Sequence, residues 1–151
     1  MQKDCFICRK HRGEVNVPGG IIFQSKQIFI SHSQIQEKEK EHYLGHIIIE
    51  TQRHVSEVSE LTDVEAQEIG LYIKRIANVL LRTTKMEHIY SFLIGDGVPH
   101  VHIHVIGRYP GAPKEFWNIK VDEWPDAPRG GEKEIVKLVN HIRKSLLEEY
   151  D

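Results

Sequence analysis

The sequence predicts an α+β fold in which an antiparallel sheet of about five strands carries two main helices. Short β-branched segments separated by turn residues point to the strands, and two long segments with helical periodicity point to the helices. The elements follow the order ββ, β, α, ββ, α, which is typical of a sheet with helices packed on it. The chain has 151 residues, a length that fits one compact domain spanning 1–151.

The strands are predicted from apolar alternation and β-branched content. Pro18-Gly19-Gly20 marks a turn before the first strand, and 25–27 marks a hairpin turn after it. Residues 33–42 are rich in Gln, Glu and Lys and are expected to form a solvated loop. The strands are expected at 21–24, 27–32, 46–51, 89–95 and 101–107.

Two amphipathic helices are predicted. Thr62 stands three residues before Glu65, which is the form of a capping box, and apolar residues then recur on one face over 63–83. A second helix is expected at 132–149 on the same grounds. Between the last strand and this helix, 108–131 contains four of the six prolines and both tryptophans, so we expect an irregular arm.

Composition limits the binding partners and the cellular location that we expect for this protein. The chain has 20 basic and 22 acidic residues, a formal net charge of −2, so we expect neither nucleic acid nor an anionic membrane as partner. No apolar run reaches the roughly 20 residues of a spanning helix. The first residues also lack the apolar centre of a signal peptide, so the cytoplasm is the expected location.

Three alternating histidines form the strongest functional signal. In a strand, His100, His102 and His104 project from one face, and the apolar residues between them project from the other. Next-nearest side chains on a strand are roughly 6–7 Å apart. The alternatives are a solvent-facing strand that is rich in histidine, a metal site at the row itself, and a nucleophile or base supported by its neighbours. Clustered titratable side chains favour the functional interpretations.

The same row suits chemistry at phosphorus. A neutral imidazole attacks phosphorus and leaves again, which divides one difficult displacement into two easier ones. Gly95 and Gly97 precede the row, and such a turn lets backbone N–H groups approach an anion.

The segment 100–106 resembles the defining motif of the histidine triad (HIT) superfamily of nucleotide hydrolases and transferases. The segment 45–54 resembles that family's glycine–histidine strand, and the resemblance covers most of the chain. It implies a HIT-like fold, a homodimer, and hydrolysis or transfer at the α-phosphate of a nucleotide. It also implies that His102 is the nucleophile and that His104 contacts the phosphate. Candidate substrates are dinucleoside polyphosphates, nucleoside phosphoramidates and nucleotide sugars.

The cysteines form a Cys-x-x-Cys pair at Cys5 and Cys8. This spacing suits two thiolates on one tetrahedral zinc, and the alternatives are a redox pair or two free cysteines. Resemblance to a zinc-containing branch of the family implies His54 and His100 as the other two ligands. The cofactor would then be a structural Zn²⁺. His42 and His46 are competing ligand candidates.

Two stretches depart from the family pattern. Asp96 and Gly97 occupy the positions of a glutamine and a hydroxyl residue, and Ser31 and His32 stand where an acidic residue usually holds the ribose. These departures keep a second interpretation open, a zinc-stabilised nucleotide-binding module with little turnover. The expected substrate- or phosphate-binding residues are His104, Gly95, Asp96, Gly97, Ser31 and His32.

Overall fold

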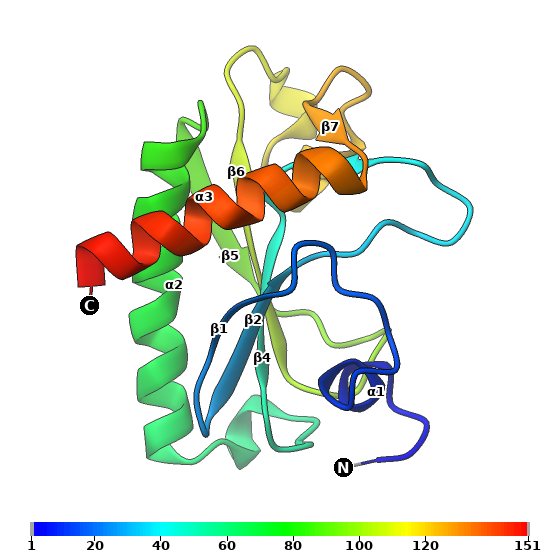
Figure 1. Cartoon of the computed structure of the whole chain (residues 1–151), viewed down its shortest axis with the longest axis vertical. Coiled ribbons are helices and arrows are strands. Elements are labelled where there is room, and N and C mark those ends of the chain that lie inside the picture. The colour runs from blue at the N-terminus through cyan, green and yellow to red at the C-terminus, as the bar shows by residue number, and fades with distance from the viewer. Residues whose placement is uncertain (1, 151) are drawn as a thin grey trace.

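The computed structural model describes residues 2–150 and has a five-stranded antiparallel sheet at its centre, as the sequence predicts. The strands lie in the order β1-β2-β4-β6-β5 (Figure 1). All four neighbouring pairs are antiparallel. The bounds are β1 (Ile21–Gln24), β2 (Ile28–His32), β4 (Ile47–Thr51), β5 (His88–Phe92) and β6 (His102–Arg108).

Helices of different size cover the two faces of the sheet. In Figure 1 the sheet is seen nearly edge-on, with the long helix α2 (Asp63–Thr83) on one side and the short helix α1 (Phe6–His11) on the other. The helix α3 (Glu132–Tyr150) crosses α2 and contacts β1. The predicted α+β class is therefore confirmed.

Side-chain alternation divides the central strands between the two faces. The isoleucines and valine that pair across the sheet on one face are buried in the main core with α2 (Ile30, Ile47, Ile49, Ile103 and Val105). The opposite face of the same strands carries polar side chains, Glu50 on β4 and His102 and His104 on β6. One face thus provides the core and the other is free for chemistry.

Several element bounds differ from the sequence prediction. The helix 63–83 is confirmed, and α3 ends one residue later than 149. The strand β5 ends at Phe92 instead of 95 because the chain then turns, with Gly95 at a φ of 77°. The short helix α1 was not predicted, since six residues carry too little periodicity.

The predicted loop and arm contain short regular elements. His42–Tyr43 forms β3, which pairs with β7 (Arg129–Gly130), so the end of the predicted solvated loop 33–42 is tied to the arm. The arm also contains the 3-10 helices η2 (Lys114–Phe116) and η3 (Asn118–Glu123), and η1 (Val58–Glu60) precedes α2. None of the helices formed by the described residues is both long enough and apolar enough to cross a membrane.

The start of α2 is fixed by the predicted capping box. The Thr62 hydroxyl accepts a hydrogen bond from the backbone N–H of Glu65 at 3.1 Å, and the Glu65 carboxylate accepts one from the Thr62 N–H at 2.9 Å. Arg53 donates two further hydrogen bonds to the Glu65 carboxylate. The cap therefore links α2 to the loop that follows β4.

Replacing Thr62 tests the stabilising role of the cap. We expect Thr62→Ala to lower the free energy of unfolding by about 1 kcal/mol, because one backbone donor of the first turn loses its acceptor. Urea unfolding followed by circular dichroism measures the change. The matched control is Val64→Ala, an exposed position in the same turn, which should stay within about 0.5 kcal/mol. Equal stability of the two variants would contradict the assigned role of the cap.

Candidate active site and metal centre

Strand register brings the polar side chains of the open face together. Glu50 lies opposite His102 in the β4–β6 pairing, and Phe92 of β5 lies opposite His104. The ring of Phe92 stacks on His104 at a centroid distance of 4.9 Å. A pocket of about 730 Å³ opens on this face, and its lining includes Lys10, His42, His46, Glu50, His102 and His104.

The tautomer of His102 is set by a backbone contact. Its Nδ1 lies 2.7 Å from the carbonyl oxygen of His100. Because a carbonyl only accepts, Nδ1 carries a proton, and in the neutral ring it is Nε2 that keeps the lone pair. The tautomer of neutral His102 therefore leaves Nε2 as the nitrogen available for attack.

A chain of imidazoles supports His104. Nδ1 of His104 lies 2.8 Å from Nε2 of His46, and Nδ1 of His46 lies 3.0 Å from Nε2 of His42. Burial lowers the pKa of all three rings, to about 4 for His104 and well below the usual range for His46. All three are therefore neutral near pH 7. If His42 donates to His46 and His46 donates to His104, then His104 has an Nε2–H free to donate.

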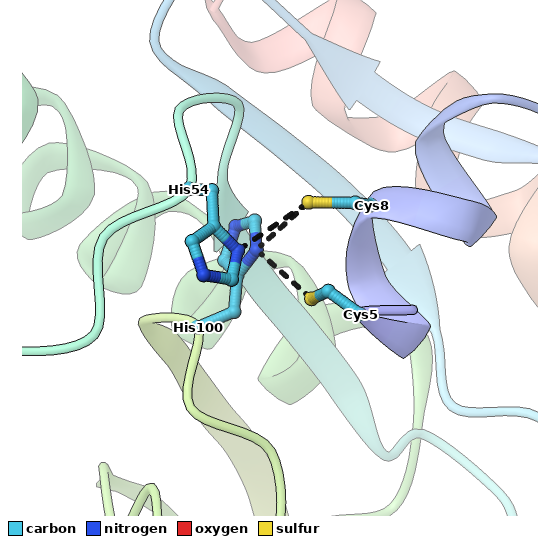
Figure 2. A group of neighbouring side chains, drawn as sticks. All are labelled: Cys5, Cys8, His54 and His100. Carbon is cyan, nitrogen blue, oxygen red and sulfur yellow. Dashed lines mark hydrogen bonds between the residues drawn. The ribbon is translucent and has the colours of Figure 1, made fainter. Parts of the chain in front are cut away.

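A second cluster joins the two cysteines to two histidines, as Figure 2 shows. Sγ of Cys5 lies 3.5 Å from Nδ1 of His100, and Sγ of Cys8 lies 3.4 Å from Nδ1 of His54 and 3.6 Å from that of His100. All four donor atoms lie within 4.8 Å of one another. The sequence thus anticipates the residues that the structure brings together here.

This geometry fits a tetrahedral zinc. Zn–S bonds of about 2.3 Å and Zn–N bonds of about 2.0 Å separate a sulfur ligand from a nitrogen ligand by about 3.5 Å. Nε2 of His100 donates to the carbonyl of Thr51 at 2.7 Å, so Nδ1 has the free lone pair that a metal ligand needs. Burial lowers the pKa of His100 to about 4, which keeps the ring neutral.

The histidine row is divided between the two clusters. The strand β6 begins at His102, so the prediction that all three histidines lie on one regular strand is wrong for His100. His100 is 1% exposed and lies beside the cysteines, whereas His102 and His104 line the pocket. Among the described residues, the possible metal cluster takes in His100 and leaves out the other two.

Other expected substrate contacts lie elsewhere. Asp96 and Gly97 are exposed, Gly95 is half-buried, and none of the three lines the pocket. Ser31 is fully buried, and its hydroxyl has no hydrogen-bond partner among residues 2–150. His32 is also fully buried, donating from Nδ1 to the Ser33 carbonyl and accepting the Gly45 N–H at Nε2. Because both its ring nitrogens are occupied, we leave His32 out of the proposed substrate site.

Two residues of the pocket were missed from the sequence. Lys10 donates to Glu50 at 2.5 Å, and both side chains are nearly fully buried. Glu50 also accepts from Nε2 of His11 at 3.0 Å. Burial alone raises the pKa of Glu50, but the contacts with His11 and Lys10 outweigh it and lower that pKa overall. The available signal was Glu50 itself, a charge inside an isoleucine-rich strand.

Comparison with known proteins identifies the family. The family model described as "HIT domain" matches residues 21–111, which is more than half of the chain. The chain therefore belongs to the HIT domain family.

Two curated relatives match over part of their length. The nitrilase and fragile histidine triad fusion protein NitFhit of Caenorhabditis elegans is 30% identical over 107 residues, 64% of this chain and 22% of that protein. The AP-4-A phosphorylase of Mycobacterium tuberculosis is 26% identical over 112 residues, 70% of this chain and 52% of that protein. The chain thus spans about a fifth of the first relative and about half of the second.

The fold is also shared with a solved structure. A Zn-bound histidine triad family protein from Mycobacterium smegmatis superposes with a TM-score of 0.70 at 14% identity, covering 96% of each chain. At this identity the likeness concerns the fold.

Metal analysis tests the cysteine–histidine cluster. We expect the purified protein to carry about one zinc per chain and Cys8→Ser to lose it, because three ligands bind far more weakly than four. Elemental analysis after gel filtration gives the ratio. Saturating zinc should also raise the melting temperature of the metal-free protein, since a ligand at a thousand times its Kd stabilises by about 4 kcal/mol. His88→Ala, an exposed histidine on β5, should keep the metal. Equal zinc in Cys8→Ser would exclude this cluster as the site.

Proposed function

We propose that this chain is a nucleotidyl hydrolase or transferase that acts at the α-phosphate of a nucleotide through a covalent intermediate on His102. The observation that carries the proposal is the tautomer of His102. The His100 carbonyl holds its Nδ1–H, so the neutral ring has its lone pair on Nε2. His102 also lines a pocket of nucleotide size. Family membership and relatives named AP-4-A phosphorylase support the substrate class.

The proposed reaction has two displacements. In the first, the Nε2 lone pair of His102 forms a bond to the α-phosphorus, and the bond to the leaving group breaks with its electron pair. In the second, water attacks phosphorus, the P–N bond breaks, and a nucleoside monophosphate leaves while the water proton passes to solvent. A phosphate acceptor in place of water gives transfer. His104 would donate its Nε2–H to a phosphoryl oxygen, with its tautomer held through His46 and His42.

The pocket favours a leaving group that needs no proton. The positions expected to assist a leaving group, Asp96 and Gly97, are exposed and do not line the pocket. A polyphosphate leaves as a stable anion, whereas the amine of a phosphoramidate needs an acid to protonate it. We therefore place dinucleoside polyphosphates ahead of phosphoramidates.

We propose that the zinc is structural. Four protein ligands, Cys5, Cys8, His54 and His100, fill a tetrahedral site and leave no position for substrate. The metal would instead hold the chain next to His102. A Zn-bound protein of the same fold supports zinc as the metal.

A homodimer remains a proposal. The strand β5 is an edge of the sheet and offers backbone groups to which a second copy could add. The cytoplasmic location and the absence of nucleic-acid and membrane partners stay predictions from the sequence.

Trapping the intermediate tests the proposal. Diadenosine tetraphosphate labelled at the α-phosphate, quenched in alkaline detergent, should leave label on the protein, because a phosphoramidate bond resists base and is cleaved by acid. We expect His102→Ala to abolish the adduct and to lower turnover by on the order of 10³-fold or more. His141→Ala, an exposed histidine on α3, is the control. Nucleotide binding without turnover or label in the parent protein would favour the binding-module interpretation.

A further inference from the structure

The pocket contains a buried ion pair that the proposed reaction does not use. Lys10 of α1 is 3% exposed and Glu50 of β4 is 1% exposed, and their charged atoms lie 2.5 Å apart. Taking two charges out of water costs several kcal/mol for each, and well-packed apolar residues often serve stability as well or better. This pair lines the pocket and lies outside the main core, so a role toward a bound ligand would explain the two buried charges.

The pair lies beside the proposed nucleophile. Glu50 is directly opposite His102 in the β4–β6 pairing, and facing side chains of neighbouring strands have Cβ atoms about 4.5–5.5 Å apart. Lys10 reaches Glu50 from α1, which covers the same face of the sheet (Figure 1). An oxygen on a phosphorus attacked by His102 would therefore come close to the Lys10 ammonium.

The charges around the pocket make Lys10 distinctive. Within residues 2–150, four carboxylate residues line the pocket, and Lys10 is the only lysine or arginine that does so. Burial lowers the pKa of His42, His46 and His104, so these rings contribute no positive charge near pH 7. The carboxylates are Glu37, Glu50, Asp122 and Glu132. Lys10 would therefore supply the permanent positive charge that attracts an anionic substrate to the pocket.

The Lys10 ammonium group has N–H donors that are not used in the ion pair. Of its three N–H bonds, one is directed to Glu50, and no other hydrogen-bond partner lies within residues 2–150. The carboxylate is in turn held by His11. Glu50 and His11 therefore fix the ammonium while leaving two donors for a ligand.

We propose that Lys10 binds non-bridging phosphate oxygens of the nucleotide and that Glu50 positions it for this contact. This inference rests on the proposed function, because it takes a nucleotide phosphate as the occupant of the pocket. It adds a substrate-binding residue that lies outside the histidine motif, on the helix that begins at the metal ligands. Binding of the phosphate group would then depend on α1 more than binding of the nucleoside does.

The test compares a charged and an uncharged probe. AMP and adenosine are titrated by calorimetry into the parent protein and into Lys10→Met/Glu50→Gln. The double variant removes both charges, so the net charge stays the same and no unpaired carboxylate is left. We expect AMP affinity to fall at least about tenfold, as for the loss of a charge-assisted hydrogen bond, with adenosine affinity unchanged within about twofold. Lys74→Met, an exposed lysine on α2, should leave both affinities unchanged.

Each remaining outcome is decisive. Thermal melting and zinc content show whether the double variant is folded, and Lys10→Gln/Glu50→Gln, which also leaves no unpaired charge, is measured as well in case it is not. Unchanged AMP affinity in a folded variant, or equal losses for AMP and adenosine, overturns the Lys10 proposal. If the Lys10 proposal fails in this way but the α-phosphate label still attaches to His102, the proposed function stands without a role for Lys10. If the parent protein binds no AMP and forms no adduct, both proposals fail together.

Discussion

The convergence of four side chains at the cysteine–histidine cluster is the constraint on which the rest of the site depends. Cys5 and Cys8 come from the start of α1, His54 from the loop after β4, and His100 from the residues just before β6. A helix of six residues is too short to be stable alone in water. Its position over the sheet therefore depends on tertiary anchors, and a metal bound at the cluster would be the strongest of them.

The cluster and the pocket are linked through the backbone. His100 turns its ring to the cysteines, while its carbonyl oxygen holds the Nδ1 proton of His102. From the other side, α1 carries Cys8 at one of its turns and Lys10 two residues later. Order at the cluster would thus fix both the proposed nucleophile, His102, and the Lys10 ammonium group that we assign to the phosphate.

Sequence patterns predicted what depends on local periodicity. Two-residue alternation placed His102 and His104 on one face, and the capping box placed the start of the helix at Asp63. Features that depend on long-range register and burial were not predicted from the sequence. The pairing of Lys10 with Glu50 joins residues 40 positions apart. Hydrogen bonds to Ser33 and Gly45 leave His32 with no nitrogen free for a ligand. The family resemblance pointed to the four residues of the cysteine–histidine cluster because a family motif carries long-range contacts that periodicity does not.

Amide hydrogen exchange with and without a chelator tests the central claim most directly. The claim is that the metal cluster anchors α1 and the entry to β6, while the rest of the sheet is stabilised by its own core. Removing zinc should therefore speed exchange over residues 6–13 and 98–102 and leave the protection of β2, β4 and α2 nearly unchanged. Unchanged protection of α1 in the metal-free protein, or loss of protection over the whole sheet at once, would contradict this account.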